Sequence, residues 1–255
     1  MDGIGLDLSI VQFVIFLVAT FAAALVAGLA GFAFGLVAAA AWLHVLSPVA
    51  TASLIIGYGL IVQGLAVWKL RHALSWTLLW PFLAGAALGV PLGAFLLTWV
   101  NPQHLRPGIG AFLVLYSIYA LARPALTPLK AGPPADMGVG FLNGVLGGMT
   151  GFAGIIVTIW SGLRGWPKDV QRAVFQPIGV ATFAMSAVWI GASGAVAAST
   201  LKLFLAGLPF LIAGTWLGLK LYGRLDEAGF RRVVLILLLV SGAALVVEPL
   251  FARLR

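Results

Sequence analysis

The stretch GLAGFAFG, residues 28–35, lies inside one of the most apolar regions of the chain. Each of its three glycines costs roughly 1 kcal/mol relative to alanine in a helix interior, so together they predict a break in a helix. A second stretch, GMTGFAGI, residues 148–155, has the same Gly-x-x-Gly-Phe-Ala order. The sequence therefore predicts two apolar helices that are broken in the same way, about half a chain apart.

The composition places the chain in a membrane. Its 255 residues are 62% hydrophobic and only 9% charged, with a mean hydropathy of +1.11, whereas a soluble domain carries roughly 25% charged residues. The net charge of +8 comes from basic residues at the ends of apolar segments, a pattern that argues against nucleic-acid binding. The chain has no cysteine, which excludes disulfides, thiolate metal sites and cysteine nucleophiles.

Apolar segments of about 20 residues, the length that crosses a bilayer, indicate six ordinary spans. They are Val49–Lys69, Trp76–Val100, Leu105–Ala122, Val170–Val196, Leu201–Tyr222 and Phe230–Phe251. The two segments with the glycine clusters differ, because Ser9–Leu46 is too long for one helix and Met137–Leu163 is long and interrupted. We predict that each is a re-entrant hairpin; the first, at 38 residues, is also long enough for two complete spans.

The similarity of the two halves extends beyond the glycine clusters. A proline turn follows each broken segment, at Ser47-Pro48 and at Trp166-Pro167. The later stretch GVPLGAFLL, residues 89–97, shares its Gly-x-x-x-Gly spacing with GTWLGLKL, residues 214–221. The offset drifts from about 120 to 125 residues, as expected of a divergent internal duplication.

The distribution of positive charge decides the topology. With two hairpins and the N-terminus outside, eleven Lys and Arg residues fall inside and four outside; with two single crossings the split is eight against seven. The positive-inside rule favours the hairpins. We therefore predict an all-α polytopic integral membrane protein of two inverted repeats, each a broken re-entrant hairpin plus three transmembrane helices, about eight transmembrane elements in all. The repeats are 1–122 and 137–255, with a Pro-rich linker at 123–136.

Broken helices at membrane depth predict a binding site. Such backbone survives only where it is buried in protein or lines a wet cavity, and paired interruptions in two repeats point to a transporter site. After each cluster a new helix begins, near Phe32 and Phe152, with free N–H groups that favour an anion. The predicted substrate-binding residues are Gly31, Phe32, Ala33, Phe34, Gly35, Gln63, Asn143, Thr150, Gly151, Phe152, Ala153, Gly154 and Gln176.

Some of these residues have a structural alternative. The glycines of the two clusters either approach a ligand or allow close helix packing, and we favour the ligand. For the Gly-x-x-x-Gly pairs that begin at Gly89 and Gly214 we favour packing. The amides of Gln63 and Gln176 either donate to an anion or bond to a neighbouring helix, and the sequence leaves both open.

Two further residues are candidates for gating or proton coupling. Arg172 draws anions in, pairs with Asp169 or anchors its helix, and anchoring is the interpretation that we favour. His44, at the end of the first hairpin, would titrate near neutral pH. The seven acidic residues all fall at ends or loops on this topology, whereas a cation carrier needs an acid near the midplane.

Three stretches together resemble the sulfite exporter TauE/SafE family. They are GFAFGLVAAAAWLHVLSP (31–48), GVPLGAFLL (89–97) followed by NPQHLRPGIGAFLVLYSIYAL (101–121), and NGVLGGMTGFAGIIVTIWSGLRGWPKDVQRAV (143–174). The resemblance runs from Val11 to about Leu250 and implies export of sulfite, of sulfonates such as sulfoacetate, or of related small anions across the bacterial inner membrane. It also implies two repeats and a homodimer. The second glycine loop departs from the family pattern, because it lacks a proline and carries Thr150.

We predict a transporter of small oxyanions, sulfite or organosulfonates above all, that works by alternating access around the two broken helices. The alternative is a transporter of another small sulfur-containing or neutral solute. An enzyme is disfavoured because the three histidines are scattered and no His-Glu-x-x-His or paired intramembrane Asp is present. The expected partners are the small anion and the lipid bilayer, with no cofactor, no metal and no nucleic acid, and the N-terminus is expected in the periplasm.

Overall fold

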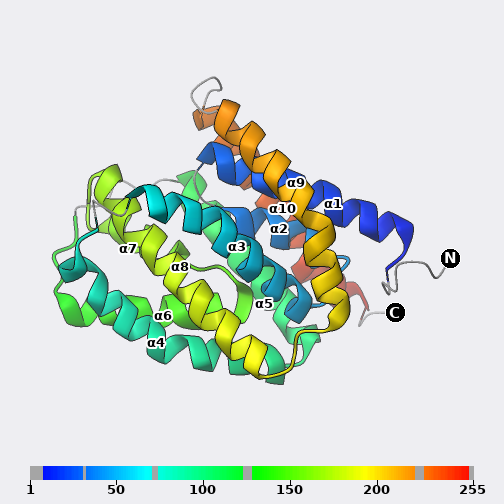
Figure 1. Ribbon diagram of the computed structural model, residues 1–255, viewed down its shortest axis with the longest axis horizontal. Coiled ribbons are helices and arrows are strands. Elements are labelled where there is room, and N and C mark those ends of the chain that lie inside the picture. The colour runs from blue at the N-terminus through cyan, green and yellow to red at the C-terminus, as the bar shows by residue number, and fades with distance from the viewer. Residues whose placement is uncertain (1–7, 31–32, 71–73, 123–127, 222–226, 253–255) are drawn as a thin grey trace. The chain divides into compact units, whose positions relative to one another are not determined.

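The computed structural model describes residues 8–30, 33–70, 74–122, 128–221 and 227–252. In these ranges the regular secondary structure consists of helices only (Figure 1). The helices are α1 (Ile10–Ala30), α2 (Phe34–Trp42), α3 (Pro48–Leu70), α4 (Trp76–Trp99), α5 (Pro102–Ala122), α6 (Pro133–Thr150), α7 (Ile155–Leu163), α8 (Lys168–Ala192), α9 (Ala198–Leu221) and α10 (Glu227–Ala252). The predicted all-α polytopic class is confirmed.

Six helices in the described part of the chain are long and apolar enough to cross a membrane. Five of them coincide with predicted ordinary spans, and the sixth is α1, over Ile10–Leu29. The last predicted span, Phe230–Phe251, lies within α10. The protein is therefore a multi-pass membrane protein.

Each broken segment consists of one long and one short helix. The long arms, α1 and α6, have 21 and 18 residues, and the short arms, α2 and α7, have nine each. Nine helical residues rise only about 14 Å, roughly half of the hydrocarbon core. The first segment is therefore not two complete spans, because α2 is too short to cross.

The helices gather into two compact units that do not follow the predicted repeats. Unit 1 contains residues 1–54, 100–124 and 196–255, and unit 2 contains residues 55–99 and 125–195. Each unit therefore combines a broken hairpin from one predicted repeat with helices from the other. The repeat boundaries themselves stay a sequence prediction.

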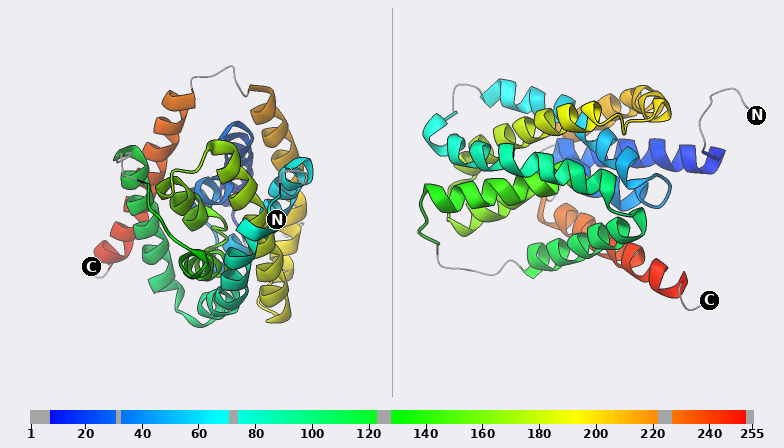
Figure 2. Two further views of the ribbon diagram at one scale, coloured as in Figure 1. Left: turned by 90° about the vertical axis from the view of Figure 1, so that its left-hand side faces the viewer. Right: turned by 90° about the horizontal axis from the view of Figure 1, so that it is seen from below.

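Glycines set the closest helix contacts in both units. In unit 2, α4 packs along α6 (Figure 2), and a Cβ atom on Gly148 would lie 2.6 Å from Val90 O and 3.3 Å from Gly93 C. In unit 1, α1 packs along α9, and a Cβ atom on Gly28 would lie 2.7 Å from Thr215 O and 2.9 Å from Gly218 Cα. Because side chains cannot fit there, backbones meet directly. The packing role predicted for the Gly89 and Gly214 motifs is confirmed.

These contacts are equivalent under exchange of the two halves. In one contact Gly148 lies against Gly93, and in the other Gly28 lies against Gly218. Gly28 and Gly148 are 120 residues apart, and Gly93 and Gly218 are 125 residues apart. In unit 2 the same exchange relates two contacts between α3 and α8. A Cβ atom on Gly59 would lie 2.5 Å from the Phe183 ring, and one on Gly179 would lie 2.5 Å from Gln63 Oε1. Gly59 and Gly179 are 120 residues apart, and so are Gln63 and Phe183. The matching supports an internal duplication.

The last helices of the halves are related by a larger offset than the sequence comparison suggested. On α5 and α10, a Cβ atom on Gly110 would lie 2.8 Å from Gly242 O, and one on Gly242 would lie 2.8 Å from Gly110 O. This mutual pair is 132 residues apart, not 125. The sequence comparison missed the additional seven residues because the linking segments have little sequence similarity to align.

Candidate functional site

The break between α6 and α7 is built by glycines with left-handed backbone. Gly151, which caps the C-terminus of α6, has φ 77°, and Gly154, which caps the N-terminus of α7, has φ 89°. Glycine adopts this conformation without the steric cost of a side chain. These two predicted site residues therefore shape the turn, whereas Gly148 in the same cluster serves helix packing.

Asn143 holds the break from within α6. Its side chain is fully buried, its Oδ1 accepts the Gly154 N–H at 2.9 Å, and its Nδ2 donates to Thr182 Oγ1 at 3.3 Å. Thr182 in turn donates to Ile178 O at 2.7 Å. The amide thus joins the start of α7 to α8, and sequence reasoning missed Thr182 because only the fold brings α8 beside Asn143.

Thr150 closes the end of α6. Its Oγ1 donates to Leu146 O at 2.7 Å and accepts the Phe152 N–H at 3.1 Å, and the residue is only 3% exposed. Both hydrogen-bonding functions of the hydroxyl therefore stabilise the turn. Three backbone donors that the sequence assigned to a ligand, those of Gly151, Phe152 and Gly154, have partners within the protein.

Further donors near the break lie in the first turn of α7. Its first internal hydrogen bond runs from Thr158 N to Gly154 O at 2.8 Å. The N–H groups of residues 155–157 therefore have no carbonyl partner within the helix. Gly154 offers no side-chain cap. This helix end carries the partial positive charge of the helix dipole, equivalent to about half an elementary charge.

Two glutamine amides belong to the helices beside this turn. A Cβ atom on Gly154 would lie 3.2 Å from Phe175 O and 3.9 Å from Gly179 Cα, so α8 packs directly against the turn. Gln63 Oε1 lies against Gly179 from α3. Gln176 is 6% exposed and precedes Gly179 by less than one helical turn. The Oε1 atoms of both glutamines are buried and have no hydrogen-bond partner among the described residues.

Among its described residues, the first break, in unit 1, shows no polar side-chain cap. Gly31 and Phe32 lie outside the described residues. Ala33 caps α2 with φ 75° and makes no side-chain hydrogen bond, and Phe34 packs its ring edge-on to Trp42, with centroids 6.1 Å apart. At an offset of 120, alanines occupy the positions of Asn143 and Thr150. Asn143 and Thr150 therefore have no polar counterpart at the first break.

The two candidates for gating or proton coupling lie in different units. His44 Nε2 is 3.2 Å from Ser241 Oγ, which donates in turn to Ala40 O, and the residue is exposed in unit 1. Arg172 is exposed in the second turn of α8, in unit 2. Neither role is tested by these contacts, and both stay predictions.

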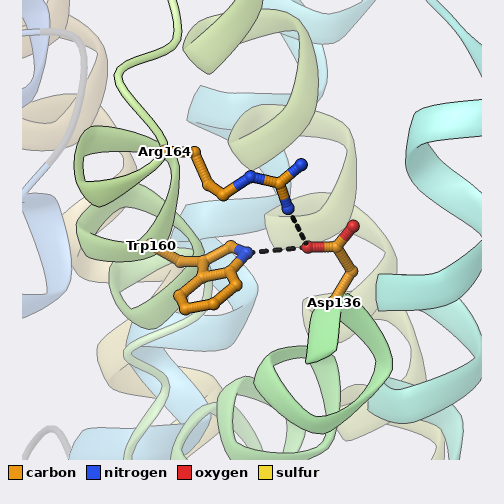
Figure 3. Close-up of polar contacts among 3 residues, drawn as sticks. All are labelled: Asp136, Trp160 and Arg164. Carbon is orange, nitrogen blue, oxygen red and sulfur yellow. Dashed lines mark hydrogen bonds and ion pairs between the residues drawn. The ribbon is translucent and has the colours of Figure 1, made fainter. Parts of the chain in front are cut away.

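An ion pair that sequence reasoning missed joins the other ends of α6 and α7 (Figure 3). Asp136 Oδ1 accepts from Trp160 Nε1 at 2.7 Å and from Arg164 Nη1 at 2.9 Å. The two charged side chains are only 10% and 16% exposed, and the Arg164 guanidinium also lies 5.0 Å from the centroid of the Trp166 ring. The Pro-Pro-Ala-Asp start of α6 was a helix N-terminus signal that could have indicated an ordered Asp136.

The comparison with known families decides the identity. A model of the family described as Sulfite exporter TauE/SafE matches residues 15–245, nearly the whole chain. The chain belongs to this family. No curated protein and no solved structure matches it. As a TauE/SafE protein it is a membrane transport protein of a family that exports sulfite, and the resemblance found in its sequence is confirmed.

Proposed function

We propose that this TauE/SafE protein exports sulfite or an organosulfonate across the bacterial inner membrane and binds it at the start of α7. The observation that carries the proposal is the uncapped first turn of α7, which begins at a glycine break packed on α8. The neighbouring helices α3 and α8 carry two buried glutamine Oε1 atoms, of Gln63 and Gln176, that have no partner among the described residues. A helix N-terminus whose N–H groups have no partner, here called open, is a ready anion site. The break in unit 1 is the counterpart that alternating access requires in the other repeat.

The chemistry of the substrate suits this turn. Sulfite and sulfonates share a head of three oxygens on sulfur, and residues 155–157 provide three N–H donors on one turn. Hydrogen bonds from N–H groups to an anion are roughly twice as strong as those between neutral groups. Asn143 and Thr150 contribute by holding the turn in shape, since they accept the N–H groups of Gly154 and Phe152. The N–H groups of residues 155–157 are left for the anion.

A transport assay tests the proposal. Labelled sulfite should exchange into sulfite-loaded proteoliposomes above the protein-free background. Gly154→Ala should lower the exchange at least tenfold, because a Cβ atom at φ 89° is strained and would lie 3.2 Å from Phe175 O. Gly162→Ala, at the other end of α7 where a Cβ atom meets nothing within 4 Å, is the matched control and should exchange normally. Absence of any anion exchange by folded protein would refute the proposal.

The moving parts of alternating access are proposed to be the two compact units and not the two repeats. Motion of repeat against repeat would pull apart the backbone contacts of α1 with α9 and of α4 with α6. Leu88 and Leu142 flank the contact of Gly89 with Phe141 and are 65% and 54% exposed.

Cysteines at these two positions can be crosslinked selectively, because the chain has no other cysteine. A crosslink of Leu88→Cys to Leu142→Cys, which joins the two repeats within unit 2, should leave sulfite exchange intact. The single-cysteine variants treated with the same reagent are the control. Loss of exchange in the crosslinked protein alone would show that the repeats themselves must separate.

A further inference from the structure

The helices around the start of α7 hold few charges. In unit 2, α4 and α7 have none, and α6 has only Asp136. Asp136 is paired with Arg164 at the far end of α7, about 14 Å along the helix axis from the open N–H groups. The pair is neutral as a whole, so it contributes little net charge to the open turn.

The described charge of α8, on Arg172, is also remote from the turn. Arg172 precedes Gly179 by seven residues, about 10 Å along the helix. Its side chain is exposed and leans toward the helix start, away from Gly179. The remaining charges, Lys69, Lys168 and Asp169, belong to the outermost turns of α3 and α8. Tyr58 on α3 is an uncharged phenol at neutral pH.

Among the described residues of unit 2, the groups beside this turn are therefore neutral. Gln63 and Gln176 bring amides whose oxygens have no donor among the residues that the structure describes, and Asn143 and Thr182 are bonded to each other. The attraction for an anion comes mainly from the helix end, which is worth about half a positive charge.

The free energy of binding an anion at such a site depends on the charge of the anion. The cost of removing an anion from water grows with the square of its charge, so a dianion costs about four times as much as a monoanion of equal size. The attraction to the helix end grows only in proportion to the charge. We infer that the site selects singly charged anions and excludes doubly charged ones, so that sulfite crosses as hydrogensulfite.

Hydrogensulfite also fits the unpartnered Oε1 atoms of Gln63 and Gln176. It carries one proton that a dianion lacks, and either buried Oε1 atom can accept that proton as a hydrogen bond. This inference rests on the proposed function and adds to it the charge state of the substrate. It further predicts that sulfoacetate, with a second charge on its carboxylate, competes more weakly than methanesulfonate.

Competition between two tetrahedral anions of similar size tests the inference. Methanesulfonate has one charge and sulfate has two at neutral pH. At about pH 7, excess methanesulfonate should reduce labelled sulfite exchange about tenfold or more, whereas the same concentration of sulfate should leave it unchanged. Protein-free liposomes correct for leakage of neutral sulfur dioxide.

A pH series and one variant complete the test. At constant total sulfite, exchange should fall about tenfold per pH unit above the second pKa of sulfurous acid, while methanesulfonate exchange stays constant. Gln176→Lys adds a positive charge and should let sulfate compete. Competition by sulfate in the unmodified protein, or sulfite exchange that does not follow hydrogensulfite, would overturn the inference and leave the transport proposal standing. Failure of every anion to exchange would overturn both.

Discussion

Gly140→Ala is expected to destabilise the protein more than any other glycine-to-alanine substitution in α6. A Cβ atom on Gly140 would lie 2.6 Å from Phe82 Cα and closer still to the Phe82 carbonyl oxygen. These are backbone atoms of α4, which cannot rotate away as a side chain can. Overpacking of this kind typically costs 1–3 kcal/mol, and we expect a value of about 3 kcal/mol here.

The measurement is thermal unfolding in detergent, followed by the fluorescence of the nine tryptophans. A loss of about 3 kcal/mol lowers Tm by roughly 10 °C for a chain of this length. The matched control is Gly138→Ala on the same helix, where a Cβ atom meets nothing within 4 Å, and its Tm should stay the same or rise slightly. Equal melting of the two variants would contradict the close packing of α4 on α6.

Asn143→Ala is expected to have the largest effect on transport. It removes the acceptor of the Gly154 N–H and the donor to Thr182 Oγ1. A buried donor without a partner costs about 1–3 kcal/mol, and the start of α7 is then no longer fixed beside α8. Sulfite exchange in proteoliposomes should fall by about a hundredfold, a loss of roughly 2.7 kcal/mol.

A second variant, Asn143→Asp, tests whether loss of transport comes from the missing hydrogen-bond acceptor or from the charge near the start of α7. The aspartate keeps an acceptor for the Gly154 N–H, loses the donor to Thr182 Oγ1 and adds a negative charge next to the start of α7, so the protein should fold while exchange is lost. Thr182→Ser, which keeps the hydroxyl that accepts from Asn143, is the control and should transport normally. Wild-type exchange in both Asn143 variants would mean that the break between α6 and α7 is not the binding site.

The candidate site was predictable where its signals were local. The left-handed turn needs glycine at Gly151 and Gly154, and this need is visible in the sequence as a cluster inside an apolar run. The roles of the polar residues were less predictable. Asn143 was expected to face a ligand, but it accepts a hydrogen bond from a residue eleven positions away, and that contact depends on how sharply the chain turns.

The sequence by itself determined the membrane class, five of the six candidate spans, the two broken helices and the family. All of these depend on composition, on runs of apolar residues and on glycine placement, which act over one helix or less. The tertiary structure decided which helices pair. The glycines of α1 meet α9 and those of α6 meet α4, although neighbours in sequence would have been the simpler choice.

The sequence did not predict which helices pair, because a glycine face can pack closely against any other face of small residues. A local glycine pattern therefore predicts close packing but not which helix is the partner. The same limit applies to Asp136, whose carboxylate is stabilised by Trp160 and Arg164 from the next helix. Partner choice is a property of the whole folded chain, because each pairing is favourable only if the remaining helices can also bury their apolar faces.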